Sequence, residues 1–117
     1  MRLGLWECKL LEGTTAQRAY NSSTIHERHR HRWEVNNAYL EQLETVGLRV
    51  SGVNPASNLA EIMEYSDHPF FVGVQFHPEL RSRPNRPHPL FVEFIKASKE
   101  TPVDGAQREL PLAEQTA

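Results

Sequence analysis

The sequence predicts an α/β protein in which strands and helices pack around one sheet. Three observations lead to this class: segments in which polar and apolar residues alternate, a nearly continuous apolar run at residues 70–76, and two segments with apolar residues at helical spacing. The chain has 117 residues, which is the length of one domain. A chain of this length buries roughly two thirds of its unfolded surface, so we expect a hydrophobic core.

The first half of the chain contains two predicted strands and a predicted helix. Residues 2–11 and 25–33 are expected to be extended, with alternate side chains on opposite faces, and a polar stretch separates them. Residues 35–46 are expected to form a helix, because their apolar side chains recur at helical spacing. Asn36 or Asn37 can cap the start of this helix, and a glycine follows its end.

The second half continues with three predicted strands and a closing helix. Residues 48–53 and 59–65 alternate and are expected to pair as a hairpin. Residues 70–76 are almost continuously apolar, as expected for a strand buried on both faces. A proline-rich loop at residues 78–89 leads into a helix predicted at residues 90–98.

The last segment, residues 100–117, differs in composition from the rest of the chain. It holds four acidic residues, one arginine, two prolines and no aromatic side chain. Such a segment has too little apolar surface to offset the entropy of ordering it. We therefore expect one domain at residues 1–99 followed by a disordered polar tail.

Composition excludes several classes of function. A formal net charge of -2 argues against a general nucleic-acid binder. The sequence has no run of about 18 apolar residues and no secretory signal, so we expect no membrane partner. The single cysteine, Cys8, cannot form an internal disulfide or a cysteine-rich zinc site, which favours the reducing cytoplasm.

The sharpest local signal is the sequence His77-Pro78-Glu79 at the end of the apolar run. In extended backbone, residues two apart share a face, so the imidazole of His77 and the carboxylate of Glu79 are expected to point the same way, with Pro78 stiffening the link. A carboxylate beside a histidine orients the ring, which is the base-and-orienter half of a nucleophilic triad. A purely structural histidine–glutamate pair is the competing interpretation.

The second signal is the run of three histidines and three arginines at residues 26–32. His29 and His31 share a strand face with Glu34 close behind, which loosely suggests a metal site. The arginines next to Trp33 could instead contact nucleic acid, or one arginine could bind a carboxylate or phosphate bidentately. A charged strand in a polar interface with another domain is the fourth interpretation.

Several segments, taken in order over residues 1–99, match one known family. They are Met-Arg-Leu-Gly at 1–4, Glu-Arg-His-Arg-His-Arg at 27–32, Glu-Val-Asn-Asn at 34–37, Gly-Leu-Arg-Val-Ser-Gly at 47–52, His-Pro-Phe-Phe at 68–71, Gln-Phe-His-Pro-Glu at 75–79, Ser-Arg-Pro at 82–84 and Pro-Leu-Phe at 89–91. The sequence resembles the C-terminal part of the glutamine amidotransferase domain of the CTP synthase family. Gln-Phe-His-Pro-Glu is shared broadly by class I amidotransferases, whereas the 27–32 run points to CTP synthases.

This resemblance implies a partial, flavodoxin-like fold with a mixed sheet and flanking helices. It also implies that a Cys-His-Glu triad hydrolyses L-glutamine, and that a synthase domain uses the ammonia and ATP to aminate UTP to CTP. By resemblance, His77 is the base, Glu79 its orienting carboxylate, and Arg32 helps to hold L-glutamine, while Trp33 stands where the family has tyrosine. No cofactor is expected in this chain. ATP and Mg2+ are expected in the synthase domain, and the whole enzyme is expected to be a homotetramer.

The sequence departs from the family pattern in one respect that bears on activity. It has no Gly-x-Cys-x-Gly elbow, and Cys8 lies in a strand-like stretch where we expect a small structural residue. We therefore expect a piece of a longer enzyme that is inactive alone, with an uncovered sheet edge or face at residues 70–76. Arg28, His29, Arg30 and His31 are expected at a polar interface without a catalytic role.

Two alternatives stay open on the sequence. One is a fragment of another class I amidotransferase or of a glutamyl hydrolase, which would keep His77 and Glu79 but use another acceptor. The other is a degenerate, non-catalytic module that binds a partner.

Overall fold

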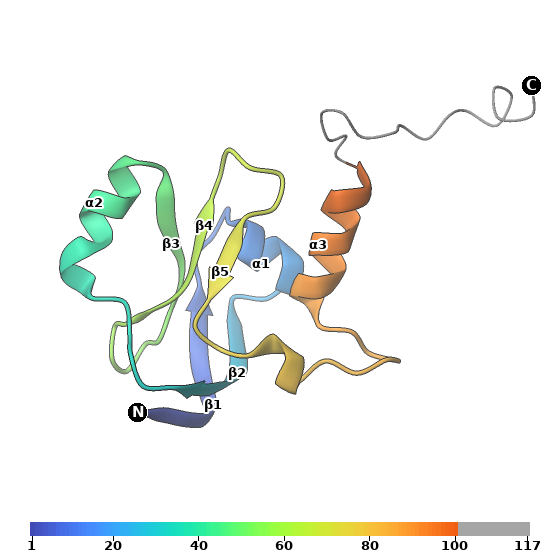
Figure 1. Ribbon diagram of the computed structural model, residues 1–117, viewed down its shortest axis with the longest axis horizontal. Helices are drawn as coiled ribbons and strands as arrows, with labels where there is room; N and C mark the ends of the chain where they lie inside the picture. The colour runs from blue at the N-terminus through green and yellow to red at the C-terminus, as the bar shows by residue number, and fades with distance from the viewer. Residues whose placement is uncertain (101–117) are drawn as a thin grey trace, which may run out of the picture.

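The computed structural model describes residues 1–100, which form one sheet flanked by short helices (Figure 1). Residues 101–117, which make up nearly all of the predicted tail, lie outside the described residues. The elements in chain order are β1 (Arg2–Leu10), α1 (Thr15–Tyr20), β2 (Thr24–His31), the 3-10 turn η1 (Asn37–Tyr39), α2 (Leu40–Thr45), β3 (Leu48–Val53), β4 (Ala60–Tyr65), β5 (Val72–Val74), the 3-10 turn η2 (Pro78–Leu80) and α3 (Pro89–Glu100).

The sheet has five strands in the order β2-β1-β3-β4-β5, and every neighbouring pair is antiparallel. β1 and β2 pair along almost their whole length, whereas β1 meets β3 only at Lys9 and Leu10. The α/β class predicted from the sequence is confirmed. The resemblance implied a mixed sheet, and within residues 1–100 the sheet is antiparallel throughout.

The β3–β4 hairpin matches its prediction, and its tight packing depends on one glycine. β3 has the predicted bounds, and a register shift interrupts the β3–β4 ladder around Gly52. A Cβ atom at Gly52 would lie 2.8 Å from Cys8 Sγ and 2.8 Å from Ile62 Cγ1. Glycine is therefore required here, because the neighbouring strands approach too closely for any side chain.

The apolar run at residues 70–76 is not the strand buried on both faces that its composition suggested. Only Val72–Val74 are paired, and β5 lies at an edge of the sheet, as the predicted uncovered edge requires. Phe71 is 47% exposed, whereas Phe76 turns into the core. The run is apolar because its two ends pack on different neighbours: Phe70 on Phe94 of α3, and Phe76 on buried histidines.

Helix α1 lies in the polar stretch between the first two predicted strands, where no helix was predicted. Its start is capped by the Thr14 hydroxyl, which accepts from Gln17 N at 3.1 Å. The backbone N–H groups of the first two helical residues, Thr15 and Ala16, donate to the buried carboxylate of Glu64 at 2.8 and 3.1 Å. A six-residue helix is too short to be stable alone, so this contact from β4 is a main reason that it forms.

The remaining two helices follow their predictions with changed ends. The helix expected at residues 35–46 begins as the 3-10 turn η1, capped by Asn36, whose side chain accepts from Ala38 N at 3.0 Å. It ends before Gly47, whose φ of +95° suits glycine. The closing helix α3 is longer than predicted and includes Glu100, the first residue assigned to the tail.

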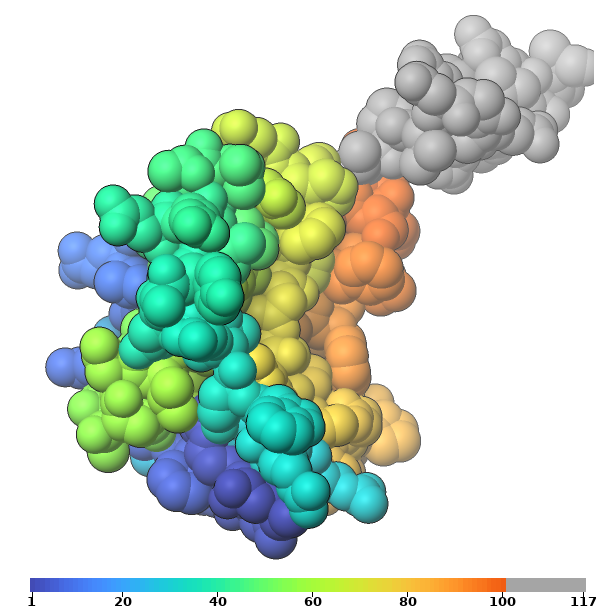
Figure 2. Space-filling view, turned by 60° about the vertical axis from the view of Figure 1, so that its left-hand side comes forward, coloured from blue at the N-terminus to red at the C-terminus, as the bar shows by residue number. Residues whose placement is uncertain are grey.

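The hydrophobic core lies between the sheet and the helices α1 and α3, which Figure 1 shows on one side of the sheet. Helix α2 packs on β3 and forms part of the outer surface in Figure 2. The core is small and is completed by buried polar side chains, several of them charged. The buried apolar residues are Cys8, Leu10, Ala16, Ile25, Ala60, Ile62, Phe76 and Leu90, and the buried polar ones are Arg2, Thr14, Glu27, His29, Ser51, Asn54, Glu61, Glu64 and His88.

Candidate functional site

The segment that follows β5 is held to the sheet at three successive residues. Gln75 N donates to the Glu61 carbonyl at 2.9 Å, and His77 N donates to the Arg28 carbonyl at 3.0 Å. Between them, the side chain of Phe76 is buried in the core. The backbone of His77 is therefore fixed against β2 before the chain turns at η2.

His77 and Glu79 lie side by side at this turn. His77 Nδ1 and Glu79 Oε1 are 2.7 Å apart, and the two side chains are 38% and 58% exposed. The sequence predicted extended backbone here, but Pro78 starts the 3-10 turn η2 instead. The two side chains still meet, because the turn folds Glu79 back toward the ring.

Glu79 is ionised at neutral pH. Hydrogen bonds from its own backbone N–H and from His77 lower the pKa of this carboxyl below its usual value. An ionised carboxylate only accepts hydrogen bonds, so Nδ1 of His77 carries the proton, and no hydrogen bond to Nε2 is recorded within residues 1–100. This arrangement equips His77 to act as a base through Nε2.

Arg32, the predicted glutamine-binding residue, lies just beyond the end of β2. The strand expected at residues 25–33 ends at His31, and Arg32 is exposed in the bend that follows. The side-chain hydrogen bonds and ion pairs recorded within residues 1–100 do not involve the Arg32 side chain. Its role stays a prediction.

A buried polar network lies on the face of β2 opposite to the exposed side chains of Arg28 and Arg30. Arg2 binds Glu34 with two hydrogen bonds, Nε to Oε1 at 2.6 Å and Nη2 to Oε2 at 2.7 Å, and its Nη1 donates to Glu61. The other oxygen of Glu61 lies 3.1 Å from His29 Nε2. His29 is thus a core residue and not part of an exposed polar interface, which corrects the expectation for this position.

Glu61 stays charged although it is buried. Burial alone would raise its pKa, but hydrogen bonds from His29 and Arg2 outweigh that effect, and the pKa of Glu61 is lowered. Glu61 was not among the site residues predicted from the sequence. The only sequence feature that indicates its burial is the apolar pair that follows it in β4, because a carboxylate in such a strand lies on a buried face.

A second buried polar cluster joins α1, β2 and the start of α3. Glu27 accepts from both the Tyr20 hydroxyl and His88 Nε2, and burial and the contact with Glu27 raise the pKa of Tyr20. Phe76 lies between this cluster and the first network, with ring centroids 5.9 Å from His29 and 6.4 Å from His88. Phe76 therefore links the position of the His77 turn to both clusters.

Cys8 is a core residue, as predicted. Its side chain is fully buried on β1, and burial raises the pKa of the thiol to about 12, with Glu61 and Glu27 adding to the shift. A thiol in this state is protonated at neutral pH and inaccessible to a substrate. Cys8 is therefore not equipped to act as a nucleophile.

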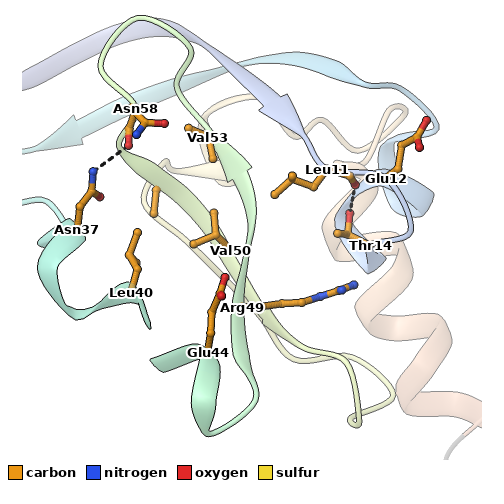
Figure 3. Close-up of a pocket in the computed structure, with 11 residues that line it drawn as sticks. Leu11, Glu12, Thr14, Asn37, Leu40, Glu44, Arg49, Val50, Val53 and Asn58 are labelled. Carbon is orange, nitrogen blue, oxygen red and sulfur yellow. Dashed lines mark hydrogen bonds between the residues drawn. The ribbon is translucent and has the colours of Figure 1, made fainter. Parts of the chain in front are cut away.

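A cavity of 810 Å³ lies away from the His77 turn, between α2, β3 and the loop that joins β1 to α1 (Figure 3). Asn37 spans one side of it by donating to the Asn58 carbonyl at 3.0 Å, and the Thr14 hydroxyl donates to the Leu11 carbonyl at 2.7 Å on the other side. The lining residues do not include the three predicted site residues. The cavity is therefore separate from the candidate site.

Two further observations concern the described part of the chain. It contains no group of three or more His, Cys, Asp or Glu side chains placed to hold a metal ion. Its longest helix, α3, has 12 residues, and neither α3 nor any shorter helix of residues 1–100 has the length and apolar character to cross a membrane.

Comparisons with known proteins identify the family of this chain. The family model for glutamine amidotransferase class-I matches residues 3–97. A CTP synthase of Thermomicrobium roseum is 61% identical over 117 residues, covering 100% of this chain and 21% of the relative. A CTP synthase of Symbiobacterium thermophilum is 63% identical over 100 residues, covering 86% of this chain and 18% of the relative.

A solved structure agrees as well. The Trypanosoma brucei CTPS glutaminase domain with bound acivicin matches with a TM-score of 0.80 and 37% identity, covering 92% of this chain and 43% of that chain. The present chain spans about a fifth of the length of the curated relatives that it matches. It belongs to the class I glutamine amidotransferase family and corresponds to part of the glutaminase domain of CTP synthases.

Proposed function

We propose that this chain supplies the histidine–glutamate half of a glutaminase triad in a CTP synthase. In this proposal the glutaminase releases ammonia from L-glutamine, and the ammonia is used for the ATP-dependent amination of UTP to CTP. The observation that carries the proposal is the 2.7 Å hydrogen bond between His77 and the ionised Glu79 on an exposed turn. Membership of the family supports it independently.

The chemistry of the pair follows from the protons it holds. With Nδ1–H donated to Glu79, Nε2 of His77 takes the proton from a cysteine thiol supplied outside this chain. The thiolate attacks the amide carbon of glutamine, the C–N bond breaks, and the imidazolium returns its proton to the departing ammonia; water then hydrolyses the thioester to glutamate and frees the thiol. Glu79 stabilises the imidazolium between these two transfers, since its negative charge lies next to the ring.

Arg32 is proposed to bind the α-carboxylate of glutamine. A guanidinium matches a carboxylate with two parallel hydrogen bonds. Support comes from the location of Arg32 on the bend after β2, the strand to which His77 is hydrogen-bonded, and from its exposed side chain.

The polypeptide of 117 residues is proposed to have no glutaminase activity by itself. Its only cysteine is Cys8, and burial and a raised pKa make this thiol unsuited to attack glutamine. Glutamate release by the purified chain, above background and abolished by His77→Ala, would contradict this proposal.

The remaining partners are proposed to lie outside this chain. ATP, Mg2+ and UTP would bind a synthase domain, and the whole enzyme would be a cytoplasmic homotetramer. The free, buried Cys8 supports a reducing compartment.

The decisive experiment is His77→Ala in the complete enzyme that carries this chain. We expect glutamine-dependent CTP formation to be lost and ammonia-dependent CTP formation to be kept. His26→Ala is the matched control, because His26 is an exposed histidine on β2. Glutamine-dependent activity that survives in His77→Ala would contradict the proposal, and so would loss of both activities.

A further inference from the structure

His29 and His31 form a hydrogen-bonded chain between a buried carboxylate and a backbone carbonyl. His29 Nε2 lies 3.1 Å from Glu61 Oε2, and His29 Nδ1 lies 2.8 Å from His31 Nε2. His31 Nδ1 lies 3.0 Å from the carbonyl oxygen of Trp33. All four ring nitrogens are therefore used in three consecutive hydrogen bonds.

The number of protons in this chain follows from its two ends. The Trp33 carbonyl and an ionised Glu61 only accept hydrogen bonds, so each of the three bonds needs its own proton from an imidazole. Two neutral histidines carry only two N–H groups. A third proton is needed, and the two rings together must then carry one positive charge.

The surrounding charges agree with this count. Glu61 does not hold the third proton, because Arg2 and His29 keep it ionised. The titratable and charged groups that face the two rings are Arg2 from β1, Glu61 from β4 and Glu34 after β2, with Glu34 Oε1 3.6 Å from His31 Nδ1. One cationic histidine and Arg2 balance these two carboxylates, whereas two neutral histidines would leave a buried negative charge without a partner.

We propose that His29 and His31 share one proton as a singly charged pair, and that this pair positions Arg32 for glutamine binding. The bond from His31 to the Trp33 carbonyl spans Arg32, so it fixes the backbone on both sides of that residue. Trp33 is 81% exposed and gives the segment little packing of its own. The positioning role rests on the proposed function of Arg32, whereas the shared proton does not.

Loss of the shared proton removes one of the three bonds. If His31 keeps its proton on Nε2, the lone pair of Nδ1 faces the Trp33 carbonyl. If it keeps the proton on Nδ1, either two ring lone pairs face each other or the lone pair of His29 Nε2 faces the Glu61 carboxylate. Each arrangement places one repulsive contact in the chain of bonds that anchors the Arg32 segment, so this segment is held less firmly once the shared proton is lost. His31 is thus a positioning residue and not a catalytic one.

The test uses two variants of the complete enzyme. His31→Asn keeps an N–H donor near the position of Nδ1 but does not titrate, and His31→Phe keeps a ring but has no donor. We expect the wild-type KM for glutamine to rise about 3- to 10-fold between about pH 6 and pH 9, the effect of losing one hydrogen bond. All KM values are corrected for the ionisation of glutamine itself. The corrected KM of His31→Asn should not change with pH, and His31→Phe should show the raised KM at every pH. Ammonia-dependent turnover should stay unchanged in both.

A measurement without glutamine separates the two parts of the proposal. The wild-type Tm should fall relative to that of His31→Asn as the pH rises, because the shared proton stabilises the fold only while it is bound. A difference in Tm between wild type and His31→Asn that does not change with pH would contradict the proposal of a shared proton. A KM in His31→Phe equal to the wild-type value at about pH 6 would overturn the positioning role. Failure of the Arg32 assignment would be seen instead as an unchanged KM in Arg32→Ala, with the Tm result intact.

Discussion

Replacing Glu79 with glutamine tests whether the His77–Glu79 pair acts in catalysis or only in structure. Glutamine keeps the size of the side chain but removes the charge that holds Nδ1–H and stabilises the imidazolium. The bond is short at 2.7 Å, yet the two side chains are 38% and 58% exposed, so solvent screens the pair. Hydrogen bonds to charged groups contribute about 1.5–3 kcal/mol, and the lower part of that range applies to an exposed pair.

The expected loss is therefore about 10- to 30-fold in kcat with glutamine, since each 1.4 kcal/mol corresponds to a factor of ten. The effect on the free energy of unfolding should be about 1 kcal/mol or less, because exposed ion pairs stabilise proteins only weakly. The assay compares CTP formation at saturating glutamine with CTP formation at saturating ammonia. Glu41→Gln, an exposed change on α2, is the matched control.

The comparison of the two nitrogen sources decides the result. If Glu79 orients the base, only the glutamine reaction slows. An equal fall with glutamine and ammonia, or no fall with glutamine, would refute the reasoning that assigns this carboxylate to the triad.

Three further predictions follow from the geometry. Arg32→Ala should raise the KM for glutamine about 10- to 100-fold with kcat changed less than about 3-fold, as expected for lost charge-assisted binding; an unchanged KM in steady-state assays would contradict its role. Glu61→Gln should lower the free energy of unfolding by about 3 kcal/mol at neutral pH, since it breaks a buried charge network. Because the pKa of Glu61 is lowered in the folded state, the stability that its charge contributes is complete above about pH 4.5 and is lost as the pH falls through the pKa of the folded state. If the difference in free energy of unfolding between wild type and Glu61→Gln, measured with urea, were the same at every pH, this prediction would be contradicted. Gly52→Ala should cost about 1–3 kcal/mol by denaturant unfolding, because its Cβ would press on Cys8, whereas Gly73→Ala has room and should change little; equal effects of the two would count against the packing argument.

The sequence predicted those elements whose signals are local. The alternation of polar and apolar residues predicted β3 and β4. The start of the η1–α2 segment was predicted from Asn36, whose side chain caps a backbone N–H group only two residues away. Helix α1 was missed because a main support is Glu64, 49 residues from Thr15 in the chain. A residue that satisfies backbone groups so far along the chain leaves no pattern near the element that it stabilises.

The candidate site divides in the same way. Residues two apart cannot separate far in space, so the sequence by itself determined that His77 and Glu79 are neighbours, although the turn that joins them differs from the extended link expected. Only the tertiary structure decided that His29 is buried against Glu61 and that Arg2 reaches the same carboxylate. The physical reason is that a buried charge must be balanced by whichever charges the folded sheet brings near it, and these come from different strands.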